Sequence, residues 1–173
     1  MDSELLILSN AVGAALAAQE LMLACAESCT GGWVSELVTA TAGSSGWFER
    51  GFVTYSNPAK QEMLGVSGAT LAKHGAVSLQ TAEEMAQGAL AHSHAQVALA
   101  ITGIAGPGGG IPASGGSPGK PVGTVCFAWC RANAPAVSET RYFSGSREAI
   151  RRQAVIHSLH GLLALLDTAK TVP

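Results

Sequence analysis

The stretch Leu21-Met22-Leu23-Ala24-Cys25-Ala26-Glu27-Ser28-Cys29-Thr30-Gly31-Gly32-Trp33-Val34 combines the signals of a buried strand, a turn and a helix start. Its first five residues form an apolar run typical of a strand, and residues 33–38 are typical of a helix. Main-chain N–H groups at such a turn are unpaired, and the helix dipole favours negative charge there. The stretch therefore predicts an α/β fold with a nucleophile or an anion site at the turn. A helix cap with glycines for a tight turn would give the same pattern.

Outward from this turn, hydrophobic periodicity predicts alternating helices and strands. The expected helices are 4–19, 30–41, 57–64, 79–92 and 146–166, and the expected strands are 21–26, 51–55, 96–102, 122–129 and 137–143. The segment from Gly65 to Ser78 should be rich in turns, and the Gly/Pro/Ser segment 103–121 is typical of a functional loop. The last two strands lie too close in sequence for a crossover helix, so they should be antiparallel.

This order predicts a three-layer α/β/α sandwich with a mixed, partly parallel sheet. The 173 residues, 47% of them hydrophobic, are expected to form a single domain over residues 1–173. The net charge is −2 and no basic block occurs, which argues against nucleic-acid binding. No segment has the length and apolarity of a membrane span, and the acidic start lacks the features of a signal peptide. A cytoplasmic protein is expected, and the low charge fits a homo-oligomer.

The four cysteines form two C-x₃-C pairs, Cys25/Cys29 and Cys126/Cys130, a spacing that raises the question of zinc. Three of them lie in apolar runs, where free cysteine behaves as a small buried hydrophobe. We therefore expect thiols in a cytosolic protein and no metal site.

Three loops should meet beyond the carboxyl ends of the parallel strands, where sites form in open α/β sheets. They are residues 27–32, 55–60 and 102–107. Ser28 in the first loop would then face Lys60 in the second. A serine hydroxyl becomes a good nucleophile when a base takes its proton. Burial and the N-terminal end of a helix both lower the pKa of a lysine, which would allow Lys60 to act as that base. An exposed lysine without a role is the alternative.

Further candidates come from the same loops. Tyr55 ends its strand and is a candidate to relay a proton or orient the base. The N–H groups after Ser28, with those of the glycines in the third loop, are candidates to bind an oxyanion. The residues expected to contact a substrate are Glu27, Cys29, Thr30, Gly31, Thr102, Gly103 and Gly106.

Cys29 is the rival nucleophile, because a thiol at a helix N-terminus has a lowered pKa. No histidine lies beside it in these loops, and a Ser–His–Asp arrangement would need one at a strand end. The five histidines are more typical of surface or capping residues. On the last helix, Arg147 and Arg151 stand four residues apart, and paired guanidinium groups can hold a phosphate. A solvated charged face is the alternative for this pair, and Arg147 is the candidate ligand.

In combination, four motifs resemble the CinA C-terminal domain family. They are Ala26-Glu27-Ser28-Cys29-Thr30-Gly31-Gly32, Gly51-Phe52-Val53-Thr54-Tyr55-Ser56-Asn57 with Lys60, His74-Gly75-Ala76-Val77-Ser78, and Thr102-Gly103-Ile104-Ala105-Gly106-Pro107 followed by Lys120-Pro121-Val122-Gly123-Thr124-Val125. The motifs occur in order over nearly the whole chain. Any one of them alone would be a weak signal, whereas the combination is specific.

The resemblance implies an enzyme that hydrolyses the carboxamide of nicotinamide mononucleotide to nicotinate mononucleotide and ammonia, without metal or cofactor. By position, Ser28 resembles the nucleophile and Lys60 the general base, with Tyr55 and Ser45 as supporting residues. The family also has a longer form with an added N-terminal domain, and this chain is expected to be of the stand-alone type. The loop 108–119 departs from the family's usual acidic version. A non-catalytic nucleotide-binding or regulatory module is the alternative.

Overall fold

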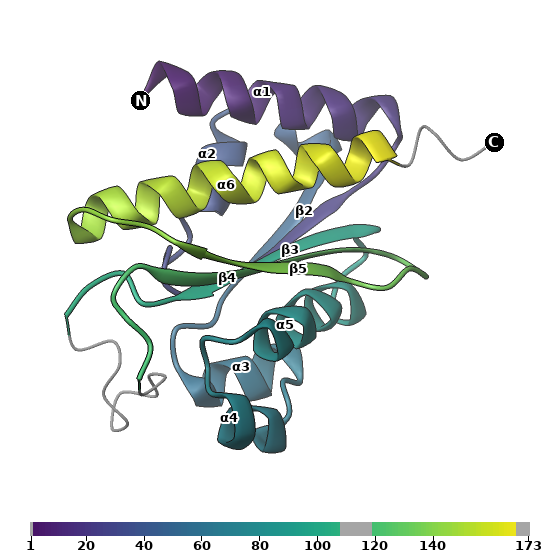
Figure 1. Cartoon of the computed structure of the whole chain (residues 1–173). Coiled ribbons are helices and arrows are strands. Elements are labelled where there is room, and N and C mark those ends of the chain that lie inside the picture. Colours follow the sequence, from purple (N-terminus) through teal and green to yellow (C-terminus); the bar gives the residue numbers. More distant parts are fainter. Residues whose placement is uncertain (1, 108–118, 169–173) are drawn as a thin grey trace.

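A mixed five-stranded sheet lies at the centre of the molecule (Figure 1). The computed structural model describes residues 2–107 and 119–168. The strand order is β2 (Phe48–Val53), β1 (Leu23–Glu27), β3 (Val97–Gly103), β4 (Thr124–Arg131) and β5 (Val137–Tyr142). β1 is parallel to β2 and β3, whereas β4 is antiparallel to β3 and to β5. The predicted mixed sheet and the antiparallel final pair are confirmed.

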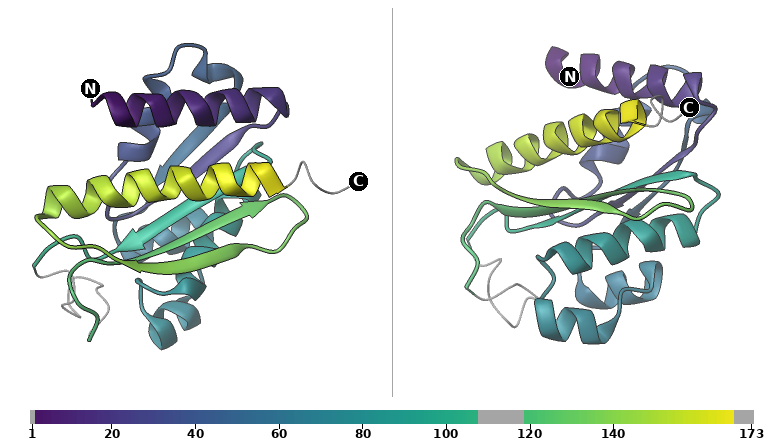
Figure 2. Two further views of the ribbon diagram at one scale, coloured as in Figure 1. Left: turned by 45° about the horizontal axis from the view of Figure 1, so that its top comes forward. Right: turned by 45° about the vertical axis from the view of Figure 1, so that its right-hand side comes forward.

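Helices cover both faces of the sheet (Figure 2). One face carries α1 (Ser3–Ala18), α2 (Trp33–Thr39) and α6 (Arg147–Thr168), and the other carries α3 (Asn57–Leu64), α4 (Gly68–His74) and α5 (Leu79–Ala91). Side chains alternate across a strand, so each face has its own core. The α6 face is built from large residues such as Leu23, Leu99 and Phe127, and the α5 face from alanines at 24, 98 and 128. The predicted three-layer sandwich is confirmed.

The carboxyl ends of the three parallel strands meet at one end of the sheet, which we call the carboxyl edge. Glu27, the last residue of β1, pairs with Val53 of β2 and with Ile101 of β3. The loops that follow these strands therefore begin side by side. This placement brings together residues that lie far apart in the sequence.

The predicted boundaries shift by one or two residues at several elements, and three differences are larger. α4 occupies part of the segment expected to be rich in turns, because Ser67 caps its start through a bond from the Ala69 N–H at 3.2 Å. β2 begins at Phe48 rather than at residue 51. α2 begins at Trp33 rather than at residue 30, because Gly31 and Gly32 have φ values of 63° and 98°, outside the helical region.

The long loop expected at 103–121 lies partly outside the described residues, since positions 108–118 are not among them. Before that gap, Gly103 ends β3, and beyond it β4 begins at Thr124. Of the described helices, none has the length and apolarity needed to cross a bilayer.

Candidate active site

The hydroxyl of Ser28 and the amine of Lys60 meet at the carboxyl edge. Lys60 Nζ lies 3.0 Å from Ser28 Oγ and donates to the carbonyl oxygen of Thr54 at 2.9 Å. Ser28 follows β1, Thr54 follows β2, and Lys60 projects from the start of α3. Both side chains of the pair are buried, with Ser28 7% exposed and Lys60 1% exposed. The loop positions in the sequence predict this juxtaposition.

The environment of Lys60 favours its uncharged form. α3 starts with Ser56 as its cap and Pro58 in its first turn, which places Lys60 within reach of the positive end of the helix dipole. Burial lowers the pKa of Lys60 from 10.5 to about 8. Within the described part of the chain, no carboxylate forms an ion pair with this amine. A large fraction of Lys60 is therefore a neutral base at mildly alkaline pH.

Glu27 fixes the turn that carries Ser28. The carboxylate is fully buried, and it faces the start of α2, where helical N–H groups have no partner of their own. It accepts five hydrogen bonds, from the hydroxyl of Thr30 (2.7 Å), the N–H groups of Gly32 (3.2 Å), Val34 (3.0 Å) and Ser35 (2.9 Å), and the hydroxyl of Ser35 (2.8 Å). Glu27 and Thr30, expected to contact a substrate, instead bind each other and α2.

Two main-chain donors at the turn remain open. The N–H of Ser28 donates to the Ile101 carbonyl at 3.0 Å, and the N–H of Gly31 donates to the Ser28 carbonyl at 3.0 Å. The N–H groups of Cys29 and Thr30 have no main-chain acceptor among the described residues, and that of Cys29 contacts only its own thiol. They directly follow Ser28, the candidate nucleophile, where main-chain N–H groups can form an oxyanion hole.

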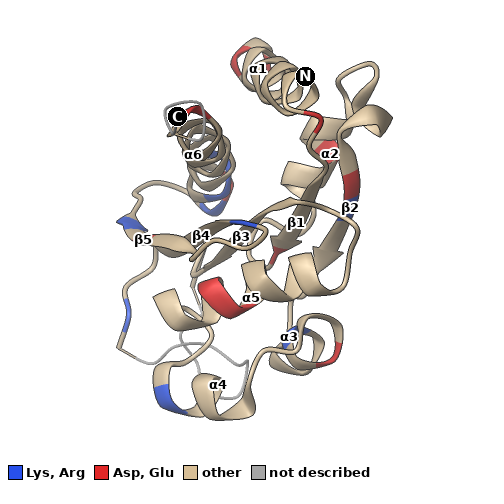
Figure 3. Ribbon diagram, turned by 90° about the vertical axis from the view of Figure 1, so that its right-hand side faces the viewer, with Lys and Arg blue, Asp and Glu red and all other residues tan. Residues whose placement is uncertain are grey.

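Arg147, near the start of α6, extends over the carboxyl edge. All Lys and Arg residues of α6 lie in its first two turns, and they form the blue part of that helix in Figure 3. Nη2 of Arg147 donates to the Tyr55 hydroxyl at 2.8 Å. The guanidinium also lies against Gly106, where an added Cβ would be 3.0 Å from Nη1. Tyr55 is 60% exposed, and the contact that the structure shows for its hydroxyl is with Arg147.

Arg151, one turn further along α6, binds the Ser28 turn from outside. Its Nε donates to the Cys29 carbonyl at 3.1 Å and its Nη2 to the Thr30 carbonyl at 2.8 Å. Its guanidinium lies 5.3 Å from the ring centroid of Trp33. An open hollow of about 470 Å³ beside the turn is lined by Trp33, Arg147, Glu148 and Arg151. Arg151 is committed to protein contacts, which leaves Arg147 as the member of the predicted pair with donors for a ligand.

Packing explains two other candidates at the carboxyl edge. Thr102 is buried, and its hydroxyl donates to the carbonyl of Ala76 at 2.7 Å, which holds the segment before α5 against β3. A Cβ at Gly103 would lie 2.8 Å from the side chain of Val125 on β4. Both residues therefore serve contacts within the protein.

Ser45 lies at the opposite end of the sheet. It belongs to a short 3₁₀ turn, Ser44–Gly46, directly before β2. A six-residue strand separates this turn from the carboxyl edge by about 16 Å. Within one chain, Ser45 therefore cannot line the same site as Ser28.

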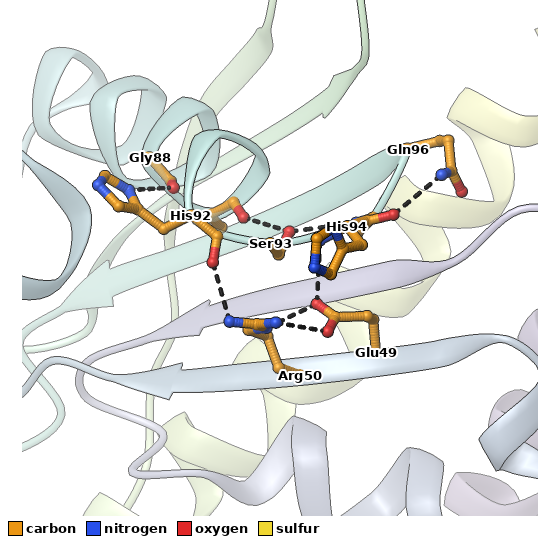
Figure 4. Close-up of polar contacts among 9 residues, drawn as sticks. Glu49, Arg50, Gly88, His92, Ser93, His94 and Gln96 are labelled. Atoms are coloured by element: carbon orange, nitrogen blue, oxygen red, sulfur yellow. Dashed lines mark hydrogen bonds and ion pairs between the residues drawn. The ribbon is translucent and has the colours of Figure 1, made fainter.

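That end of the sheet has its own polar network (Figure 4). Arg50 donates to the His92 carbonyl at 3.0 Å, and the His94 N–H donates to Glu49 at 3.3 Å. The His92 ring contacts the Gly88 carbonyl at 2.8 Å, which caps the end of α5. His157 pairs with Glu139 far from the turn. The capping interpretation fits His92, whereas His157 lies within α6, half-buried against the rings of Phe127, Trp129 and Phe143.

The expectation of a lowered pKa for Cys29 is wrong. Its thiol is only 6% exposed and packs in the apolar core, and burial raises its pKa to about 12. Cys25 and Cys29 belong to the core on one face of the sheet, whereas Cys126 and Cys130 belong to the other. The two pairs cannot share a metal ion. Within residues 2–107 and 119–168, no three His, Cys, Asp or Glu side chains are grouped to hold one.

Sequence reasoning missed Thr54 and Trp33. Thr54 contributes to the site through its carbonyl oxygen, a group that every residue type carries. The sequence places Trp33 only at the start of a helix, and its contact with Arg151 depends on how α6 crosses the turn. The one sequence feature that could have indicated a role for Thr54 is its position directly before Tyr55 at the end of a strand.

Comparisons with known proteins agree on one family. The model of the family described as CinA C-terminal domain matches residues 6–166. The nicotinamide-nucleotide amidohydrolase PncC of Escherichia coli K12 is 53% identical over 161 residues, which cover 93% of this chain and 94% of that protein. The protein of the same name from Pseudomonas putida is 51% identical over 81% of this chain and 83% of its own length. The crystal structure of the competence/damage inducible protein CihA from Agrobacterium tumefaciens superposes with a TM-score of 0.87, at 44% identity, covering 95% of this chain and 97% of that one.

Proposed function

Because this chain belongs to the CinA C-terminal domain family, we propose that it hydrolyses nicotinamide mononucleotide to nicotinate mononucleotide and ammonia, with Ser28 and Lys60 as a catalytic pair. The observation that carries the proposal is the 3.0 Å separation of Ser28 Oγ and Lys60 Nζ, both buried, with a pKa of about 8 for the lysine. The names of the relatives from E. coli and P. putida support the reaction.

The chemistry proceeds in two steps. Neutral Lys60 takes the proton of Ser28 while Oγ attacks the carboxamide carbon, and the N–H groups of Cys29 and Thr30 hold the resulting oxyanion. Lys60 then gives that proton to the departing nitrogen, so that ammonia leaves and an ester to Ser28 remains. A water molecule, deprotonated by Lys60, attacks the ester and releases the carboxylic acid and the serine hydroxyl. Each step uses the same base, and none needs a metal.

The substrate contacts fit a nucleotide better than a free base. Arg147 lies at the edge of the site with guanidinium donors that are not used by carboxylates in the described structure. A planar guanidinium binds a phosphate group strongly. We assign the phosphate of the substrate to Arg147 and to the adjoining hollow lined by Trp33 and Glu148. Free nicotinamide has no group for this site.

Ammonia release tests the proposal. The substrates are nicotinamide mononucleotide, nicotinamide and glutamine, each with and without a chelator. We expect activity on the nucleotide alone, unchanged by chelation, and its loss in Ser28→Ala and in Lys60→Ala. Lys73→Ala, at an exposed lysine of α4, is the matched control and should keep full activity.

Two other outcomes would redirect the assignment. Near-normal turnover by Ser28→Ala, combined with loss of activity in Cys29→Ser, would transfer the role to the thiol. Tight binding of the nucleotide with no product over hours would favour the non-catalytic nucleotide-binding module.

We further propose that the protein acts in the cytoplasm as a homo-oligomer. Four free thiols and a low content of charged residues, 13%, support these two assignments. Light scattering coupled to size exclusion measures the assembly, and a mass of one chain would contradict it.

A further inference from the structure

Thr54 connects both members of the Ser28–Lys60 pair through its main chain. Its N–H donates to the Glu27 carbonyl at 2.8 Å, which ties it to the strand that carries Ser28. Its carbonyl accepts from Lys60 Nζ at 2.9 Å. The residue is completely buried. Thr54 and Lys60 are therefore two buried residues joined by a main-chain contact.

The hydroxyl of Thr54 is the exception among the buried threonines. Within the described residues, Thr54 Oγ1 is buried and has no hydrogen-bond partner. The other buried threonine hydroxyls each donate to an oxygen: Thr30 to Glu27, Thr81 to Gly75, Thr102 to Ala76 and Thr124 to Pro121. A buried hydroxyl without a partner costs free energy that a valine of the same shape would not. The position therefore requires a partner outside the protein atoms.

Lys60, in its ammonium form, has one hydrogen-bond donor more than it has partners among the described residues. Its ammonium form carries three N–H donors. In the described structure Nζ has two partners, Ser28 Oγ and the Thr54 carbonyl. Among the described residues, one donor of the ammonium and the Thr54 hydroxyl are thus both left without a protein partner, and the two residues are already joined through the Thr54 carbonyl. Buried waters bind at such places, where they connect polar groups that lack partners.

We propose that Thr54 is a positioning residue for the general base, and that one buried water links its hydroxyl to Lys60 Nζ. The water accepts the third proton of the ammonium form and donates to Thr54 Oγ1. This link favours the protonated amine, so it sets how basic Lys60 is when it receives the proton of Ser28. The inference rests on the proposed Ser28–Lys60 pair.

The test is the pH profile of kcat/KM in Thr54→Val, which keeps the shape and removes the hydroxyl. Without the link the ammonium loses an acceptor, so the acid limb should move to lower pH by about one unit. Thr54→Ser keeps the hydroxyl and should retain the wild-type limb. Thr124→Val is the matched control, since it removes a buried hydroxyl bonded to Pro121 and should leave the limb in place.

A second readout does not depend on turnover. Titration of the Lys60 ε-carbon by ¹³C NMR should show the same shift in Thr54→Val and none in Thr124→Val. Thr54→Ala serves if the valine variant does not fold. A Thr54→Val limb that coincides with that of the wild type would overturn the proposal, as would a high-resolution crystal structure without a water bonded to both atoms. If Ser28→Ala keeps activity, the catalytic pair fails instead, and the NMR titration still reports on the link.

Discussion

Burying Lys60 lowers the stability of the folded protein. The difference between its usual pKa of 10.5 and about 8 in the folded state corresponds to about 3 kcal/mol at neutral pH. Lys60→Met, which fills the space without a charge, should therefore raise the free energy of unfolding by roughly 1–3 kcal/mol at pH 7, less than the full cost because Thr54 loses a donor. Chemical denaturation measures the change, and activity should vanish in the same variant.

The pH dependence of the stability gained in Lys60→Met tests whether the charge of Lys60 causes that gain. Below pH 8 both the folded and the unfolded protein carry a protonated lysine, and the destabilisation is fully present. Between pH 8 and 10.5 only the unfolded state binds the proton, so wild-type stability rises with pH and the gain shrinks. Lys73→Met, at an exposed position, should change stability by less than about 0.5 kcal/mol at any pH. An equal gain at pH 7 and pH 10 would show that packing, rather than charge, is responsible.

The sequence predicts the pair at the centre of the site because Ser28 and Lys60 lie in loops that follow neighbouring parallel strands. It does not predict which hydroxyls and carboxylates are already used by the protein. Glu27 and Thr30 look like substrate ligands in a list of polar residues, yet the Glu27 carboxylate accepts from N–H groups of α2 and the Thr30 hydroxyl donates to that carboxylate. For Cys29, the proximity of a helix start suggested an acidic thiol, whereas burial, visible only in three dimensions, has the opposite effect.

At the scale of the element, the start of α2 depends on one buried carboxylate. Glu27→Gln keeps the shape but replaces an acceptor oxygen with a donor that faces helical N–H groups. We expect a loss of about 2–4 kcal/mol in the free energy of unfolding, and lower kcat because the Ser28 turn shifts. Glu36→Gln, at an exposed site in the first turn of the same helix, is the matched control. A similar loss in both variants would mean that only the helix dipole matters.

Arg147 and Arg151 lie one helical turn apart on α6, and we expect them to have different roles. Arg147→Gln removes the guanidinium assigned to the phosphate, so KM for the nucleotide should rise about 10–100-fold with kcat nearly unchanged. Arg151→Gln leaves the Cys29 carbonyl without its donor and the Thr30 carbonyl with the Trp33 N–H alone, so it should lower Tm and kcat instead. Steady-state kinetics and thermal unfolding distinguish the two. If Arg151→Gln raises KM more than Arg147→Gln, the phosphate lies on the other arginine.

Long, periodic elements were predictable, and short ones were not. α1, α5 and α6 each present a buried face over three or more turns, and β3 is continuously apolar. α4 has seven residues, of which Leu71 is the buried one, so its periodicity is too brief to detect. β2 is an edge strand, mostly exposed or half-buried from Phe48 to Gly51, and charged residues there concealed its beginning.

For the whole molecule, the proposed catalytic pair is divided between layers: Ser28 lies in the turn that follows β1, and Lys60 lies on α3, a helix packed against one face of the sheet. The position of α3 depends on its contact with α5, where a Cβ at Gly88 would lie 2.0 Å from the Leu64 carbonyl oxygen. Gly88→Ala should therefore displace α3 and separate the pair. We expect a loss of about 1–3 kcal/mol from overpacking and a fall of about 100-fold in kcat/KM, since small misplacements of a base are costly.

Gly13→Ala makes the comparison decisive, because it introduces a similar collision in a layer without catalytic residues. A Cβ at Gly13 of α1 would lie 2.7 Å from the ring of Trp47, on the other face of the sheet. Thermal unfolding should show a comparable loss of stability in both variants, while kcat/KM should fall only in Gly88→Ala. Equal activity losses would mean that the sheet transmits strain from either face to Ser28, and that the separation of the pair between two layers has no mechanical consequence.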